Sequence, residues 1–174
     1  MNTPAASSVI PLALLVGIGA TALMDLWLLA LQRAGLPTMD FAMLGRWVGH
    51  LARGRVAHAA IRQSPPVRGE RALGWLAHYA VGVAFALALV ALQGPGWLAR
   101  PSLMPALAFG LASVVAPLFV LQPAMGAGVA SSRTPSPLKN SLRSLANHAV
   151  FGLGLFVSAT VLSATVLSVT ALSQ

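Results

Sequence analysis

The sequence predicts an all-α integral membrane protein: a four-transmembrane-helix bundle with an interfacial amphipathic helix in the first cytoplasmic loop. Three observations lead to this fold class. Hydrophobic residues make up 57% of the 174 residues and charged residues only 8%, which leaves more apolar surface than a water-soluble fold can cover. Four apolar stretches are long enough to cross a bilayer, and basic residues gather in alternate connections between them. We expect residues 1–174 to form a single membrane domain.

The four spans are expected at approximately 9–31, 72–93, 103–123 and 145–172. A bilayer core about 30 Å thick needs roughly 20 helical residues, because lipid offers no partner for an unpaired backbone group. The same requirement decides the last span, whose repeat SATVL-SATVL-SVTAL is rich in Val and Thr and would otherwise favour a strand. Its hydroxyls spiral around the helix, so we expect them to bond their own i−4 carbonyls.

The distribution of charge predicts the topology. Seven arginines lie between the first two spans and Arg133, Lys139 and Arg143 between the last two, whereas the connection 94–101 carries only Arg100. Because basic loops stay on the cytoplasmic side, we expect both termini outside and the basic loops against an anionic inner leaflet. The net charge of +8 thus reflects membrane topology, and no nucleic-acid partner is expected.

An amphipathic helix is expected at approximately 38–53, within the first basic loop. Its apolar and basic side chains fall on different sides, with Phe41, Leu44, Trp47, Val48 and Leu51 on one and Arg46, His50 and Arg53 on another. This is the pattern of a helix lying at the membrane surface.

Proline and glycine predict where the third span becomes irregular. Pro117 removes a backbone donor in mid-span, and Pro123, Gly126 and Gly128 follow, so we expect a kink or a frayed end there. The following stretch, 131–140, is rich in Ser and Pro and is expected to be an irregular loop.

Five polar side chains lie within the spans: Asp25, His78, Gln122, Asn147 and His148. An ionisable group at bilayer depth costs about 2.5–3.5 kcal/mol. Counting 1.5 Å per residue from the nearest cytoplasmic arginine places Asp25, His78 and His148 roughly 12, 10 and 8 Å deep, and Gln122 ends its span on the same side. The sequence therefore predicts one polar layer, in which an Asp–His pair or relay can form.

Simpler structural roles are also open for these side chains. Asp25 can reach the headgroup layer or pair with Arg33, and Gln122 can satisfy carbonyls freed by the prolines. Asn147 and His148 can simply begin the fourth helix. Hydrogen bonds of this kind between helices need no further function.

A metal or haem site is a weaker alternative, and no cofactor is required by the sequence. Asp25, His78 and His148 are suitable metal ligands without a spacing motif, and the two histidines can act as axial haem ligands. The absence of cysteine excludes thiolate sites and disulfides. An enzyme is disfavoured, because phosphate-loop, HExxH and GxSxG motifs are missing and the chain has three acidic residues.

Four stretches carry a family resemblance. They are GIGATALMDLW at 17–27, LGRWVGH at 44–50, GERALGWLAHY at 69–79 and RSLANHAVFGLGL at 143–155. With them the chain resembles a family of small bacterial inner-membrane proteins, domain of unknown function twenty-nine thirty-eight. The resemblance implies a bacterial inner membrane and a multi-pass helical fold. It implies no activity, cofactor or site residue.

Three functional hypotheses follow. The first is a small permease or proton-linked transport component gated by Asp25, His78 and His148, and it calls for a homo-oligomer because four helices form a thin wall. The second is a structural or assembly subunit that contacts other membrane proteins through small residues such as Gly17, Gly82 and Gly110. The third is a metal- or haem-binding membrane protein.

Overall fold

The computed structural model of the protein describes residues 6–172. Every regular element within that range is a helix. Four helical segments are long and apolar enough to cross a membrane, at Ser7–Arg33, Glu70–Gln93, Leu103–Ala124 and Pro137–Val166. The predicted all-α fold class with four transmembrane helices is confirmed.

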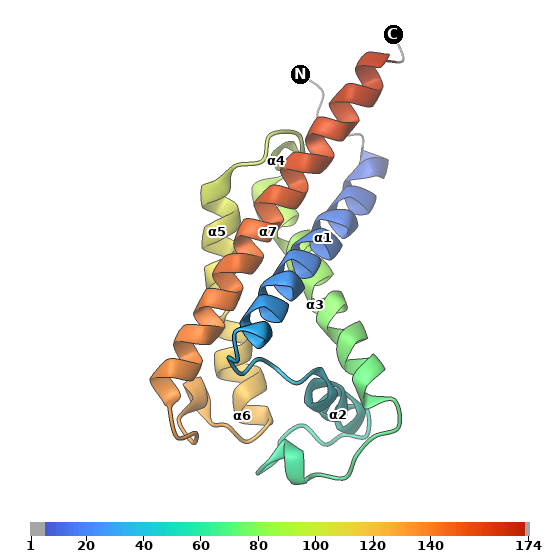
Figure 1. The fold of residues 1–174 in the computed structure, drawn as a ribbon. Helices are drawn as coiled ribbons and strands as arrows, with labels where there is room; N and C mark the ends of the chain where they lie inside the picture. Colours follow the sequence, from blue (N-terminus) through green and yellow to red (C-terminus); the bar gives the residue numbers. More distant parts are fainter. Residues whose placement is uncertain (1–5, 173–174) are drawn as a thin grey trace.

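The two longest helices form the centre of the bundle (Figure 1). α1 (Ala6–Arg33) and α7 (Pro137–Leu172) pack together, α3 (Glu70–Gln93) packs on α1, and α5 (Leu103–Ala112) packs on α7. α1 begins and α7 ends at one end of the bundle, beside the short α4 (Gly96–Ala99), and we call this the terminal end. The opposite end, where α2 (Phe41–Leu51) and α6 (Gln122–Ala124) lie, is called the loop end.

Glycines allow the spans to approach closely. A Cβ atom added to Gly17 of α1 would lie 2.6 Å from Val83 Cα of α3, and one added to Gly110 of α5 would lie 2.5 Å from Gly152 Cα of α7. Such small residues let helix backbones pack against each other in lipid. Gly17, Gly82 and Gly110, which suggested contacts with other membrane proteins, are therefore used in contacts within this bundle.

The third span is irregular near Pro117, as predicted. α5 ends at Ala112, a π-helical segment η2 follows at Ala116–Leu121, and α6 covers Gln122–Ala124. Because Pro117 has no N–H group, the Ser113 carbonyl accepts instead from Ala116 N at 3.1 Å. Widened turns of this kind are frequent at functional sites. This one contacts α6 and lies towards the loop end.

α2 (Phe41–Leu51) crosses the loop end of the bundle. Asp40 begins it as an N-cap, because its Oδ1 accepts from Ala42 N at 3.0 Å. A Cβ atom at Gly45 would overlap the Glu70 carbonyl, and one at Gly74 would overlap the Phe41 carbonyl. The backbones of α2 and α3 therefore touch at this crossing.

The basic side of α2 differs from the prediction. Arg46 and His50 were expected on a polar side of a surface helix, yet both are largely buried. Arg46 forms a bidentate ion pair with Glu70, with N–O distances of 2.7 and 2.8 Å. It also donates to the Ser64 carbonyl at 3.1 Å. The connection 52–69, including η1 (Ile61–Gln63), folds back over α2 and supplies these partners.

The fourth helix begins earlier than the loop prediction allowed. Residues 131–140 were expected to be irregular, but α7 begins at Pro137, after η3 (Val129–Ser131). Proline is well suited to the first helical position, because its fixed φ matches the helix and its missing N–H has no partner there. The prediction of an irregular loop is therefore wrong for 137–140.

The hydroxyls of the SATVL repeat behave as predicted in part, and Ser168 donates to the i−3 carbonyl of Thr165 at 2.8 Å. Thr160 and Thr165 donate to the i−4 carbonyls of Phe156 and Val161, at 2.8 and 2.9 Å. Ser163 is an exception, because it donates to the Ala99 carbonyl of α4 at 2.9 Å. That bond ties α7 to the terminal-end connection.

Candidate functional site

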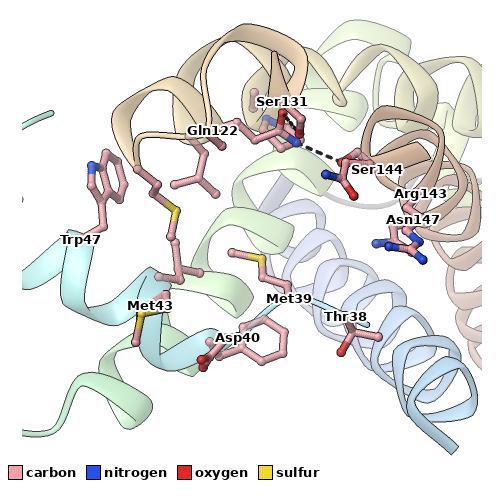
Figure 2. A pocket seen from close by; sticks show the side chains of 18 of the residues that line it. Thr38, Met39, Asp40, Met43, Trp47, Gln122, Ser131, Arg143, Ser144 and Asn147 are labelled. Carbon is pink, nitrogen blue, oxygen red and sulfur yellow. Dashed lines mark hydrogen bonds between the residues drawn. The ribbon is translucent and has the colours of Figure 1, made fainter. Parts of the chain in front are cut away.

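A cavity of about 950 Å³ opens within the loop end of the bundle. Its walls come from α1, α2, α3, the irregular part of the third span and α7, and from the connections that cross this end (Figure 2). Apolar side chains form most of the wall, including Met24, Leu28, Met43, Phe85 and Phe151. Four of the five predicted polar residues also line it, namely His78, Gln122, Asn147 and His148.

Asp25 lies behind the wall, bound to His78. His78 Nε2–H donates to Asp25 Oδ1 at 2.9 Å, and the Tyr79 hydroxyl donates to Oδ2 at 2.8 Å. The Phe41 ring of α2 covers the imidazole at a centroid distance of 4.6 Å. Both carboxylate oxygens are thus satisfied by neighbours on α3, and His78 connects the half-buried acid to the cavity.

His148 is held on the other side of the cavity by the third span. Its Nδ1 lies 2.7 Å from Ser113 Oγ, and that hydroxyl donates to the Gly110 carbonyl at 2.6 Å. Because the hydroxyl proton is already used, Nδ1–H of His148 is the donor and Nε2 is the nitrogen left to accept. The imidazole is therefore fixed in one tautomer when neutral.

Gln122 and Asn147 also have separate partners. Gln122 accepts from the Ser131 hydroxyl at 2.9 Å and donates to Ser144 Oγ at 3.2 Å. Asn147 Oδ1 accepts from the Trp27 indole N–H at 3.0 Å. These bonds join the end of the third span to α7, and α7 to α1.

The structure thus brings Asp25 and His78 together and keeps the other three apart from them. Within residues 6–172, no hydrogen bond connects the Asp25–His78 pair to Gln122, Asn147 or His148. Four of the five residues line one cavity, and the five do not form one continuous chain of bonds.

Their hydroxyl and indole partners were missed in the sequence, since Ser, Thr and Trp are common in membrane helices. Tyr79 carried a usable signal, because it directly follows His78.

Charged residues at the cavity were missed as well. Arg62, Arg133 and Arg143 line it together with Asp40. Arg62 lies 3.6 Å from the Asp40 carboxylate and is mostly exposed. The basic loop residues predict the topology, and their sequence spacing does not reveal that three of them converge on one cavity.

A second polar cluster lies next to α2. His50 Nδ1 is 2.8 Å from His58 Nε2, and His50 Nε2 is 3.1 Å from the Pro65 carbonyl oxygen. Both imidazoles are buried, and the backbone N–H of His58 donates to the Ala124 carbonyl at 2.9 Å. Burial lowers the pKa of His58, with Arg55 adding to the effect. His58 therefore joins the connection 52–69 to the third span, and its imidazole is favoured in the neutral form.

The metal and haem hypotheses gain no ligand set from the structure. In the part of the chain that the structure describes, no three His, Asp or Glu side chains are grouped to hold a metal ion. His78 and His148 are each bound to a different neighbour. Both hypotheses stay predictions.

These features define a multi-pass helical membrane protein with four spans and a cavity at one end. The family model described as "Protein of unknown function (DUF2938)" matches residues 14–162, and the chain belongs to that family. The resemblance found in the sequence is thereby confirmed. No curated protein and no solved structure matches the chain.

Proposed function

We propose that the protein is a small-molecule permease whose substrate site is the loop-end cavity. The size and lining of the cavity are the main support for this proposal. Sites for small molecules are typically about 300–1,000 Å³, mostly apolar, with a few convergent polar groups, and the loop-end cavity of about 950 Å³ has this character. Polar groups within spans also tend to mark solute pathways.

We further propose that the cavity opens to the cytoplasm of a bacterial inner membrane. The connections at the loop end contain most of the arginines, which favours the cytoplasmic side for that end and the outer side for both termini. A homo-oligomer would give the solute path a thicker wall than four helices provide.

The Asp25–His78 pair supports a proton-linked mechanism. Asp25 is shielded from the cavity, whereas His78 lines it. A proton bound or released by this pair changes the charge next to the substrate without exposing the carboxylate. Substrate occupancy and protonation would then be coupled through one side chain.

The experiment is uptake of radiolabelled solutes by vesicles that contain the purified protein. A panel of carboxylates, amines and uncharged solutes is compared with protein-free vesicles. We expect saturable uptake of at least one class, and Asp25→Asn should lower it about tenfold. Thr160→Val is the matched control, because it removes a membrane hydroxyl that bonds only its own helix. Uptake equal to protein-free vesicles for all classes, with the fold intact, would refute the permease.

A further inference from the structure

We infer that the cavity binds an amphiphilic organic anion, with a carboxylate at Arg143, Ser144 and Asn147 of α7 and an apolar body in the interior. The inference rests on the proposed function of the cavity and adds the substrate class. Two independent observations support it: the positive charge at the cavity, and the hydrogen-bond donors that the protein leaves unused there.

The balance of charge is positive because every carboxylate of the three acidic residues has another partner. Asp25 is bound by His78 at 2.9 Å, Asp40 by Arg62 at 3.6 Å, and Glu70 by Arg46 at 2.7 Å. Arg133 and Arg143 also line the cavity. Neither forms an ion pair with a carboxylate among residues 6–172. The cavity therefore offers two positive charges that the protein itself does not neutralise.

The hydrogen bonds along α7 also favour an anionic ligand. Ser144 Oγ accepts from Gln122, which leaves its own hydroxyl proton to donate. Asn147 Oδ1 accepts from the Trp27 N–H, a group that can only donate, so the amide NH₂ of Asn147 is the part left for a ligand. Together with the Arg143 guanidinium, this stretch presents donors to the cavity.

The position of these groups makes them a joint site. Residues three or four apart are neighbours on a helix, so Asn147 lies one turn beyond both Arg143 and Ser144. Figure 2 shows the three on α7, with Ser144 bonded to Gln122. These donors favour a ligand that accepts several hydrogen bonds and carries negative charge. A carboxylate does both, and arginine is well suited to bind it.

The apolar part of the cavity wall indicates the chemistry of the rest of the ligand. Met24, Leu28, Val81, Phe85 and Phe151 line the cavity away from the loops. Apolar and sulfur-containing side chains of this kind favour a hydrocarbon body over a polar one. A compact, strongly hydrated anion would leave most of the cavity unfilled, so the ligand is an amphiphile.

The test uses Trp47, which also lines the cavity. Its fluorescence is measured in nanodiscs of zwitterionic lipid while 11-bromoundecanoate or 11-bromoundecanol is added, since bromine quenches tryptophan on contact. We expect saturable quenching by both probes, with the carboxylate binding about tenfold more tightly. Trp47→Phe identifies the signal that comes from the cavity.

Arg143→Gln should weaken binding of the carboxylate about tenfold and leave the alcohol unchanged. The alcohol thus reports whether the variant retains its cavity. Arg68→Gln is the matched control, because Arg68 is exposed and is not among the residues that line the cavity. It should change neither affinity.

The outcomes separate the two proposals. Equal affinity for acid and alcohol, or no effect of Arg143→Gln, would overturn the anion and leave the cavity as a binding site. Saturable quenching by neither probe would count against the proposed function itself. In nanodiscs of anionic phospholipid, loss of quenching by the carboxylate with that by the alcohol retained would assign the site to a lipid head group and overturn a free acid.

Discussion

At the scale of single residues, the hydrogen bonds determine which nitrogen of each buried histidine carries a proton. The Pro65 carbonyl can only accept, so His50 is protonated on Nε2 and its Nδ1 accepts from His58 Nε2–H. His58 Nδ1 is then unprotonated, and it is buried with no hydrogen-bond partner among the described residues. Acid would place a charge at this nitrogen, in a position that offers it no acceptor.

The first prediction is that acid destabilises the protein through His58. Burial lowers the pKa of His58 in the folded state, so below its ordinary value of about 6.5 the unfolded chain binds more protons. The stabilisation is complete above that value and is lost as the pH falls towards the folded pKa. The midpoint of thermal unfolding should therefore be lower at about pH 5.5 than at about pH 7.5.

His58→Gln serves as the comparison, because its amide can still donate to His50 Nδ1 but cannot titrate. The pH dependence of its unfolding midpoint should be smaller than that of the unaltered protein. An identical dependence in the two proteins would show that other groups are responsible.

At the scale of elements, the α2–α3 crossing holds the floor of the cavity. Gly45 and Gly74 bring the two backbones into contact, and Arg46 pairs with Glu70 beside them. The Glu70 carboxylate also accepts from Val67 N at 3.0 Å, at the N-terminus of α3. Since Met43, Leu44 and Trp47 of α2 line the cavity, its shape depends on this crossing.

The second prediction is that Gly74→Ala undocks α2. The new Cβ atom would overlap the Phe41 carbonyl, and overpacking of this kind costs about 1–3 kcal/mol. The thermal midpoint should fall, and trypsin should cleave the arginine-containing connection 52–69 faster.

Gly19→Ala is the control, because its Cβ atom would meet only the movable side chain of Ser158, while alanine favours a helix by about 0.5–1 kcal/mol. It should be nearly neutral. If the two variants unfold alike, the close crossing does not hold α2 in place.

Features that depend on local sequence could be predicted from this chain, whereas features that depend on tertiary packing could not. Helix existence depends on local apolar length, and depth follows from counting residues, so the spans and the facing depths of Asp25 and His78 were accessible. The direction in which a side chain points around its helix depends on packing, which is why the Ser113 partner of His148 was not foreseen. Arg46 and His50 are buried by a connection that only the folded chain places over them.

At the scale of the whole molecule, the two ends of the bundle are unlike. At the loop end, α2 and the basic connections surround the cavity. At the terminal end, Trp97 and Leu98 of α4 are buried in the core with residues of α1 and α7. The cavity is lined mainly by residues of the loop half, so under the proposed function a solute would enter it from that end. Under that proposal, the orientation of the bundle in the membrane decides which compartment supplies the ligand.

The third prediction is that the loop end faces the cytoplasm, and the chain is well suited to the test because it contains no cysteine. Gln63→Cys places one thiol on an exposed residue at the loop end, and Ser102→Cys places one on an exposed residue at the terminal end, just before α5. A membrane-impermeant maleimide should label Ser102→Cys in intact spheroplasts and Gln63→Cys only after lysis, because basic connections are retained inside. The unaltered protein should give no signal. The reverse pattern would mean that the cavity faces the outer side, so that an anion would enter from there. Labelling of both sites before lysis would contradict a bundle whose two ends lie on opposite sides of the membrane.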